Sequence, residues 1–427
     1  MRDVNTMRQA VFFSALLSLL FLWAPQSAKA QCGTTAATGV VNWTTQWCDE
    51  FNGVANSPIS SANWTYDTGA GGWGNNELET YCAPGSNTSP CSTSAPNAYV
   101  DGNGHLAIKV YQVGSAYSSA RLKTQNLQMF HSGRIEANIM IPSATGLWPA
   151  FWMLGQQSGV SWPTVGESDI LENWPTTSNI AGPGATGNRS TIHTKVTGGS
   201  GMGGAYTFPA GQQVDTAFHT YGKIWSANMI QYYVDTPAQP FFVVTAVDLP
   251  SGDVWPFSSS ADSFFIIMNM AVGGTLGAPV DTATGAQSPM LVDYVRQYVP
   301  STIPAPSLTA AGNLTVKAGA TSGNSVSMSV ANSTGTGRVA FACTTTAPKA
   351  SCVVTSSDAV NKHTVDFSNS SVASTTVTVT TTANTQHGGK ANGTVPGTYS
   401  VTVNAFTESS TDATVPSSTG SFSLSVL

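Results

Sequence analysis

The sequence predicts an all-β protein that consists of two successive β-sandwiches. Short apolar runs are broken by clusters of Gly, Pro, Asn and Asp, as expected for strands that are joined by turns. No helical periodicity persists over a full window of the chain. The composition changes after a proline-rich stretch, which divides the chain in two. Charged residues make up only 9% of the 427 residues, so folding must depend on apolar burial and turns rather than on ion pairs.

The first thirty residues have the pattern of a secretory signal. Arg2 and Arg8 precede an apolar run over residues 10–24, and small residues suitable for cleavage end at Ala30. This run is shorter than the roughly twenty residues that cross a bilayer, and no other stretch is apolar enough to do so. We therefore expect cleavage near Ala30 and a secreted or extracytoplasmic protein without a membrane span.

The pattern of residues 31–300 predicts many short antiparallel strands. The clearest runs lie at residues 106–110, 135–141, 224–225, 230–234 and 264–271. Many short strands separated by turns are typical of two packed antiparallel sheets, here a β-sandwich of jelly-roll type. One sheet must curve to form a cleft.

Six cysteines, an even number, suit an oxidising compartment. They fall into local pairs, which suggests three short-range disulfides, although six cysteines allow about fifteen connectivities. The suggested pairs are Cys32/Cys48, Cys82/Cys91 and Cys343/Cys352.

A short β-prone run at residues 167–172 contains three carboxylates. Strand alternation places Glu167 and Asp169 on one face and would turn Glu172 to the other. A β-bulge near Ile170 and Leu171 would return Glu172 to the acidic face, and bulges are over-represented beside active sites. We therefore predict a bulge in this strand, on the concave face of the curved sheet.

The spacing of the two glutamates suits chemistry on a sugar. Without the bulge residue their offset is four residues, which span roughly 13 Å at about 3.3 Å per residue, and each side chain can cover about 4 Å of it. The remaining gap, on the order of 5 Å, is the carboxyl separation of a retaining glycosidase. The like charge of Asp169 should separate the pKa values, so that one carboxyl stays protonated while another ionises. The alternative, a charged face of a surface strand, fits poorly with the apolar and aromatic flanks.

Those flanks resemble glycoside hydrolase family 16, and the Glu-x-Asp-x-x-Glu spacing is that of its laminarinase branch. The matching motifs extend over roughly residues 40–300: GWGNNEL at 72–78, SARL at 119–122, GRIEA at 133–137, GLWPAFWMLG at 146–155, WPTVG at 162–166, IH at 192–193, FHTY at 218–221, MNMAVGG at 268–274 and VDYVR at 292–296. The resemblance implies a concanavalin A-like jelly roll and an endo-β-1,3-glucanase that needs no cofactor for catalysis.

The resemblance also implies roles for the acidic residues. Glu167 would be the nucleophile, and Glu172 the general acid that afterwards activates water. Asp169 would hold Glu167 in place and tune its proton affinity. His193 is expected in the cleft, hydrogen-bonded near this trio.

Substrate contacts are carried over in the same way. Trp148 and Trp152 are four residues apart on a predicted strand and face the same side, and the family match favours stacking on sugars over a core role. Arg121 and the pair Asn75 and Asn76 match positions that bind sugar hydroxyls. Other tryptophans are expected to fill the core: Trp43, Trp47, Trp64 and Trp225.

The sequence departs from the family pattern at two places that bear on the site. Ser168 stands where the family usually has an apolar residue, and it should point into the core and need a hydrogen-bond partner there. The segment Thr275-Leu276-Gly277 stands where an aromatic residue is frequent. We therefore expect a weaker outer subsite.

Many family members hold a structural calcium ion on the convex side of the sandwich. Here Asp293 and backbone oxygens near Glu50 and Gly104 match its position, and oxygen ligands suit a hard cation. The alternative is an ordinary salt bridge between Asp293 and a nearby Arg or Lys.

The proline-rich residues 301–306 are expected to form a stiff linker. Residues 307–427 are rich in Ser, Thr, Val and Ala, and about seven short strands in roughly 120 residues are typical of an immunoglobulin-like sandwich. Tyr399 lies where a tyrosine corner is expected. Because this segment contains no Trp, we expect a spacer or attachment module rather than a strong carbohydrate binder. The alternating runs lie at 313–317, 325–330, 339–343, 375–380, 398–403 and 421–427.

The formal charge of -6 provides no basic patch, which argues against nucleic acid and anionic membranes as partners. A neutral β-1,3-glucan is compatible with it, and we expect a monomer. Two alternatives remain: a mixed-linkage β-1,3-1,4-glucanase, and a protein that binds glucan without cutting it. The presence of all three acidic residues favours the enzyme.

Overall fold

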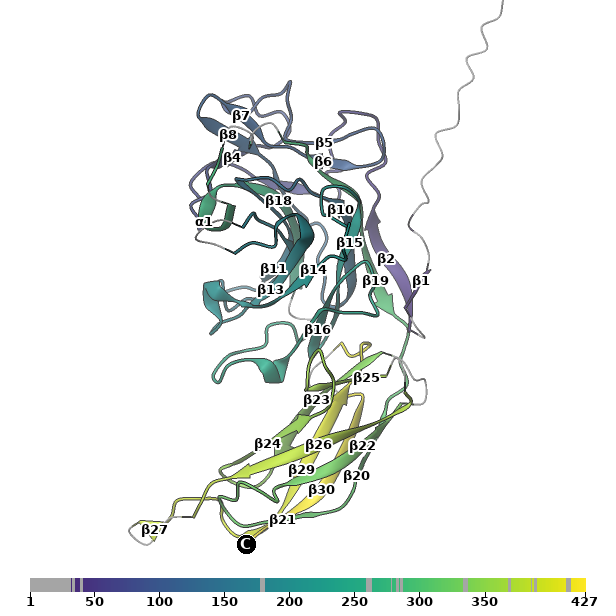
Figure 1. Ribbon diagram of the computed structural model, residues 1–427, viewed down its shortest axis with the longest axis vertical. Coiled ribbons are helices and arrows are strands. Elements are labelled where there is room, and N and C mark those ends of the chain that lie inside the picture. Colours follow the sequence, from purple (N-terminus) through teal and green to yellow (C-terminus); the bar gives the residue numbers. More distant parts are fainter. Residues whose placement is uncertain are drawn as a thin grey trace, which may run out of the picture.

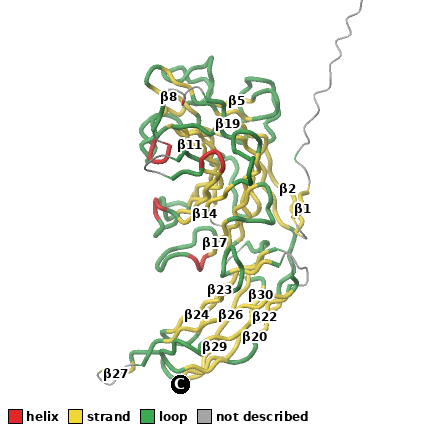
Figure 2. The backbone as a smooth tube through the Cα atoms, viewed as in Figure 1, coloured by secondary structure: helices red, strands yellow, loops and turns green. Residues whose placement is uncertain are grey.

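The computed structural model describes residues 32, 35–38, 41–176, 181–258, 263–277, 279–281, 284, 287–332, 337–367, 370–384, 386–387, 390–411 and 416–427. The expected signal segment lies outside these residues. Within the described part of the chain, no helix has the length and hydrophobicity that crossing a bilayer requires. Strands and loops make up nearly all of the molecule, which confirms the all-β prediction (Figure 2).

Two antiparallel sheets form the larger unit (Figure 1). The strands of the first sheet are β1 (Thr35–Thr38), β2 (Val41–Asp49), β19 (Met290–Pro300), β10 (Gly133–Met140), β15 (His219–Ser226), β16 (Met229–Val234) and β17 (Phe242–Thr245), with β5 (Ala98–Val100) and β6 (Leu106–Ile108) beside β19. The second contains β14 (Met202–Thr207), β13 (Gly187–His193), β12 (Glu167–Glu172), β11 (Leu147–Gln156), β18 (Ser263–Val272), β9 (Arg121–Lys123) and β3 (Thr65–Asp67).

Smaller elements complete this unit. A short sheet pairs β4 (Glu79–Tyr81) and β7 (Tyr111–Val113) with β8 (Ala116–Ser119). The helical segments are single turns: η1 (Gly184–Thr186), η2 (Gly198–Ser200), η3 (Ala246–Asp248) and α1 (Gly274–Gly277).

One continuous hydrophobic core lies between the two large sheets, as alternation along each strand requires. Trp64 and Trp225 are buried in it, Trp43 is buried in a smaller cluster at its edge, and Trp47 is half-buried against it. The core role expected for these four tryptophans is thus confirmed for three and partly met by Trp47. All three suggested disulfides are present: Cys32–Cys48, Cys82–Cys91 and Cys343–Cys352.

Two further sheets follow residues 301–306 and enclose a core of their own. The Tyr399 hydroxyl donates to the Val395 carbonyl at 2.9 Å, which is the contact expected of a tyrosine corner. The immunoglobulin-like assignment stays a prediction. One sheet contains β20 (Ser307–Ala310), β22 (Ser325–Ala331), β26 (Val372–Thr381) and β24 (Ala350–Thr355); the other contains β21 (Leu314–Val316), β30 (Ser418–Val426), β29 (Gly397–Phe406), β23 (Arg338–Thr345) and β25 (Thr364–Asp366), and a two-stranded hairpin pairs β27 (Gln386–His387) with β28 (Lys390–Ala391).

The C-terminal unit packs directly against β16 and β17 of the larger one. Gln231 on β16 donates to the Glu408 carboxylate at 2.7 Å and accepts from Arg338 at 3.2 Å, and all three side chains are buried. The Asn361 amide donates to the Val243 carbonyl on β17 at 2.9 Å. The two units are therefore docked through buried polar contacts, not joined by residues 301–306 alone.

Candidate active site

The carboxylate strand β12 contains the predicted β-bulge. Against β11, Asp169 pairs with Trp152 and Leu171 with Phe151, so Ile170 is the extra residue. Against β13 the register also shifts, since Asp169 pairs with Thr191 and Glu172 with Arg189. Two residues of β12 thus oppose one residue of each neighbour, which restores Glu172 to the face of Asp169. The predicted bulge is confirmed.

Two buried side chains of β13 stabilise this bulge. The Ile170 carbonyl accepts hydrogen bonds from Ser190 Oγ at 2.7 Å and from Asn188 Nδ2 at 3.2 Å. A bulge takes a carbonyl out of the regular ladder, and a buried carbonyl without a partner is costly. The two side chains therefore provide the hydrogen bonds that the β-ladder cannot give to this carbonyl.

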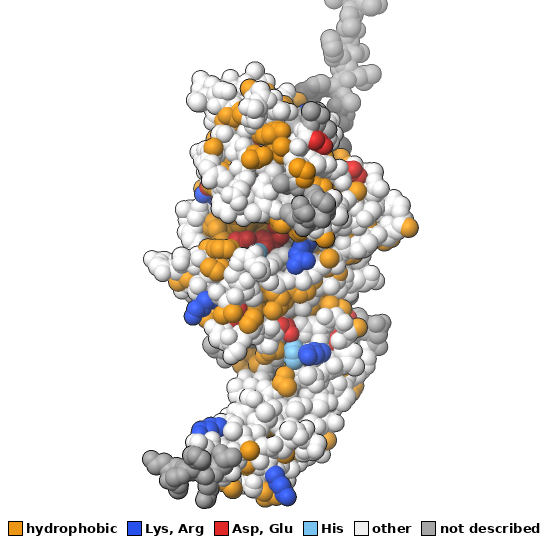
Figure 3. Space-filling view, turned by 60° about the vertical axis from the view of Figure 1, so that its left-hand side comes forward, with side chains coloured by type: hydrophobic (Ala, Val, Ile, Leu, Met, Phe, Trp, Pro, Cys, Tyr) orange, Lys and Arg blue, Asp and Glu red, His pale blue; other side chains and the backbone are white. Residues whose placement is uncertain are grey.

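All three carboxylates open into one cleft of about 690 Å³ on the surface of the second sheet. Figure 3 shows a hollow with acidic side chains on its floor and apolar side chains along its rims. Its lining includes a set of aromatic side chains: Trp73, Trp148, Trp152, Trp162 and Trp174. Flat apolar rings beside polar groups suit the alternating apolar faces and hydroxyl edges of a sugar chain.

Each glutamate accepts a hydrogen bond from a different indole. Glu167 accepts from Trp162 at 2.7 Å, and Glu172 accepts from Trp148 at 3.1 Å. Burial and the neighbouring charge of Asp169 raise the pKa of both glutamates. The positive charge of Arg121 lowers the pKa of Glu167, whereas the negative charge of Glu167 raises the pKa of Glu172. Both pKa values rise to about 8, so the expected separation of the two carboxyl pKa values is not seen in the free protein.

His193 lies where it was expected, beside the trio. Its Nε2 is 3.2 Å from Asp169 Oδ2 and 3.8 Å from Glu167 Oε1, and its Nδ1 donates to the Gly198 carbonyl at 2.7 Å. Burial alone would lower the pKa of His193, but the two carboxylates and the carbonyl outweigh it and raise the pKa to about 10. The imidazolium offsets negative charge at the Glu167 end of the cleft.

Trp148 and Trp152 share the cleft face of β11 with Ala150, as their spacing predicted. Trp148 is mostly buried and packs on Trp174. Trp152 donates from its indole to Asn269 at 2.8 Å. Both rings are therefore held in fixed orientations beside the carboxylates.

Arg121 also lines the cleft, clamped between two aromatic rings. Its guanidinium lies 5.1 Å from the Trp73 ring centroid and 4.8 Å from that of Trp152. Its Nε pairs with Asp67 at 3.0 Å. This arrangement fixes a cation against two rings, and it brings Trp73, which the sequence left unassigned, into the site.

The two neighbouring asparagines differ in position. Asn75 lines the cleft and donates to Glu77 at 3.1 Å. Asn76 has a φ of 58° in the adjoining turn and is not among the described side chains that line the cleft. Glu77 in turn accepts from Tyr81, which accepts from Asn269. A buried polar chain thus connects Asn75 to Trp152.

Sequence reasoning assigned no role to Trp162, Arg189 or Asn269, which also line the cleft. Trp162 belongs to a quoted motif and precedes the nucleophile candidate by five residues, but its contact with Glu167 depends on how the intervening loop folds. Thr275 and Leu276, which stand where the family frequently has an aromatic residue, lie in the cleft wall.

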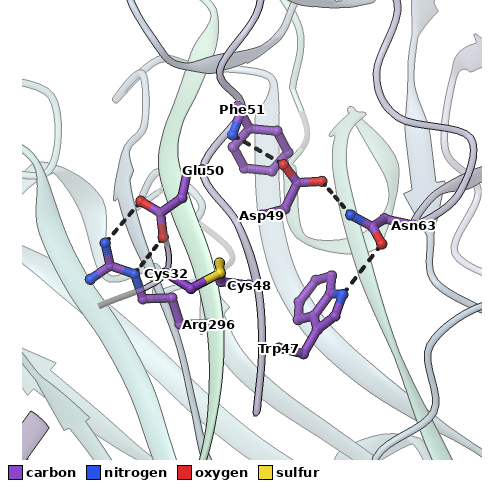
Figure 4. Close-up of a disulfide and its surroundings, with 8 residues drawn as sticks. All are labelled: Cys32, Trp47, Cys48, Asp49, Glu50, Phe51, Asn63 and Arg296. Atoms are coloured by element: carbon purple, nitrogen blue, oxygen red, sulfur yellow. Dashed lines mark hydrogen bonds and ion pairs between the residues drawn. A yellow bond between two sulfur atoms is a disulfide. The ribbon is translucent and has the colours of Figure 1, made fainter. Parts of the chain in front are cut away.

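The region of the expected calcium site contains an ion pair. The Glu50 carboxylate forms a two-point ion pair with Arg296, at 2.7 and 2.8 Å, beside the Cys32–Cys48 disulfide (Figure 4). That carboxylate is therefore committed to a cation of the protein. The predicted ligands are Asp293 and main-chain oxygens near Glu50 and Gly104, and the calcium site stays a prediction.

Comparisons with known proteins agree with this geometry. Residues 86–273 match the profile of the family described as glycosyl hydrolases family 16. The β-glucanase of Rhodothermus marinus is 32% identical over 304 residues, which cover 68% of this chain and 94% of that protein. The glucan endo-1,3-β-glucosidase A1 of Niallia circulans is 30% identical over 292 residues, 62% of this chain, but this match spans only 39% of that protein.

A comparison with solved structures shows the same similarity to β-1,3-glucanases. The endo-β-1,3-glucanase of Pyrococcus furiosus superposes with a TM-score of 0.53 at 33% identity, covering 63% of this chain and 99% of that one. The shared part corresponds in extent to the larger unit.

Proposed function

Because this chain belongs to glycosyl hydrolase family 16 and is therefore a glycoside hydrolase, we propose that it is a secreted endo-β-1,3-glucanase that cleaves laminarin-like glucans with retention of configuration. The bulge in β12 is the observation that carries the proposal, since it brings Glu167 and Glu172 to one face with Asp169 between them. Two carboxyl groups on one cleft floor are what a double displacement requires.

The proposed steps give Glu167 and Glu172 the roles that the family resemblance implies. Glu172 holds the proton and donates it to the glycosidic oxygen, while the Glu167 carboxylate attacks the anomeric carbon. The bond from that carbon to the leaving oxygen breaks as the bond to Glu167 forms. Glu172, now ionised, then takes a proton from a water molecule whose oxygen attacks the anomeric carbon. The bond from that carbon to Glu167 breaks, which releases the sugar and restores both carboxyl groups. His193, which pairs with Asp169, balances the negative charge of Glu167.

The test compares the mature protein with Glu167→Gln on laminarin, lichenan, cellulose and agarose. We expect reducing ends to be released from laminarin by the parent protein, and this rate to fall at least a thousandfold in the variant. Asp215→Asn, at an exposed position outside the cleft, is the matched control. Undiminished hydrolysis by Glu167→Gln would remove Glu167 from its role, and faster cleavage of lichenan than of laminarin would favour the mixed-linkage alternative.

Stereochemistry provides a separate test. Proton NMR during the first minutes of laminarin hydrolysis should show the β-anomer of the new reducing end before mutarotation. The α-anomer appearing first would contradict the double displacement.

We also propose the processing and division of the chain: a signal over residues 1–30, a catalytic domain over 31–300, a linker over 301–306 and an immunoglobulin-like domain over 307–427. The end of β19 at Pro300 and the start of β20 at Ser307 support the last two boundaries. N-terminal sequencing of exported protein should begin near Gln31.

A further inference from the structure

A lysine lies fully buried in the core of the larger unit. Lys223, on β15 of the first sheet, has no exposed surface, and its Nζ lies 4.6 Å from the centroid of the Trp225 ring and 5.9 Å from that of Phe264. A buried ammonium group is costly unless hydrogen bonds or opposite charges compensate it. Its presence at this position therefore needs a reason.

The lysine reaches across the sandwich to the back of the carboxylate strand. Its Nζ donates to Ser168 Oγ at 2.9 Å, and Ser168 Oγ lies 2.6 Å from the hydroxyl of Tyr232, the cross-strand neighbour of Lys223. Ser168 is the residue between Glu167 and Asp169, and it is fully buried. The hydrogen-bond partner that the sequence analysis required for Ser168 is thus provided by two residues of the opposite sheet.

The surroundings of Lys223 contain little else that is charged. Tyr232 on β16 is a titratable neighbour, and Asp169 lies on the cleft face of β12, directly behind Ser168. The neighbours of Lys223 on β10 and β18 are apolar: Ile135 is its cross-strand partner, and Phe264 lies near its amine. No carboxylate among the described residues lies within ion-pair distance of Lys223. The amine therefore contacts the carboxylate strand, and the acidic group that acts on its charge is Asp169.

We propose that Lys223 is a positioning residue of the active site, whose ammonium group holds β12 through Ser168 and acts on the negative charge of Asp169 from behind the strand. The assignment rests on the proposed roles of Glu167 and Asp169. Unlike these two residues, Lys223 needs no contact with substrate, because it acts only through the strand that carries the two carboxylates.

The charge of Lys223 should change within the working range of the enzyme. Burial lowers the pKa of Lys223 to about 7, against a smaller raising effect of Asp169. The positive charge behind Asp169 is consequently present in mildly acidic solution and is lost as the pH rises through neutrality. A side chain that only fills the core would have no such dependence.

Lys223→Met tests the proposal, because methionine has a similar length and suits an apolar site. The variant leaves Ser168 and Tyr232 paired with each other, so no polar group is orphaned. We expect kcat on laminarin at pH 5.5 to fall about tenfold with KM within twofold, because the change acts on the catalytic strand and not on sugar contacts. Tyr232→Phe, which keeps the bond between Lys223 and Ser168, is the matched control and should stay within twofold of the parent.

The ratio of parent to variant kcat should itself depend on pH. We expect about ten at pH 5.5 and a value near one at pH 8.5, where the parent has lost the same charge. A ratio that is constant between these pH values, or equal kcat at pH 5.5, would overturn the proposal and leave Lys223 a packing residue. If Lys223→Met does not fold, Ser168→Ala, which removes the acceptor but keeps the amine, should lower kcat by a similar factor; unchanged kcat would refute the coupling. An inactive parent protein would instead refute the proposed function.

Discussion

The hydrogen bond between Trp162 and Glu167 gives the sharpest prediction of the site. Trp162→Phe keeps an aromatic ring in the cleft wall but removes the indole N–H that Glu167 accepts at 2.7 Å. This bond favours the ionised carboxylate, because it lowers the pKa of Glu167 against the raising effects of burial and Asp169. The variant should therefore hold its nucleophile less firmly and in the wrong protonation state over a wider pH range.

The magnitude follows from the exposure of the donor. A hydrogen bond to a charged group contributes about 1.5–3 kcal/mol. Trp162 is 48% exposed, so water can partly replace the indole, and the lower end, about 1.5 kcal/mol, applies. This free energy corresponds to about a tenfold loss of kcat/KM on the acidic side of the pH profile. It equals a shift of about one pH unit in the midpoint of the acid limb of that profile. Since the pKa of Glu167 rises, this limb should move to higher pH.

The assay is reducing-sugar release from laminarin between pH 4 and pH 9, analysed as kcat/KM. Trp174→Phe is the matched control, because it removes an indole in the same cleft whose N–H donates to the Ala181 carbonyl and not to a carboxylate. We expect the control to leave the acid limb in place. An unmoved limb in Trp162→Phe, or equal shifts in both variants, would refute the reasoning.

Three further changes probe the bulge, the docking of the two units and the buried histidine. Ser190→Ala removes one of two donors to the Ile170 carbonyl, so chemical denaturation should show a loss of about 1 kcal/mol; full stability would mean the bulge needs no such support. Arg338→Met leaves the buried Asp358 side chain without its cation and should cost about 3–5 kcal/mol in the same assay. The pKa of His193 is raised to about 10 in the folded protein. Its contribution to the free energy of unfolding is therefore complete below the unfolded pKa of about 6.5 and is lost as the pH rises through 10. His193→Gln should remove that alkaline loss, and an unchanged pH dependence would contradict the pairing with Asp169.

Much of the fold could be predicted from local sequence patterns. The runs expected at residues 135–141, 230–234 and 264–271 correspond to β10, β16 and β18, with ends that differ by at most two residues. In the C-terminal unit, β20, β24 and β25 were not expected. These strands are short, and their pairing with sequence-distant strands defines them more than their own composition does.

The site could be predicted where chemistry is concentrated in a short segment. The bulge followed from one requirement, that Glu172 share a face with Glu167, and period-two alternation makes this impossible without an extra residue. The positions of Trp148, Trp152 and His193 agreed with expectation as well. The exception is Asn76, which lies in a turn next to the cleft.

The sequence by itself determined what depends on neighbours along the chain: the strand periodicity, the bulge, the close cysteine pairs and the carboxylates of residues 167–172. Only the tertiary structure decided which distant side chains meet. Lys223 lies behind Ser168, and Arg338 reaches Gln231 across the boundary between the units. Such contacts arise because folding brings together residues more than fifty positions apart, and no local pattern encodes which buried amine will lie behind a catalytic strand.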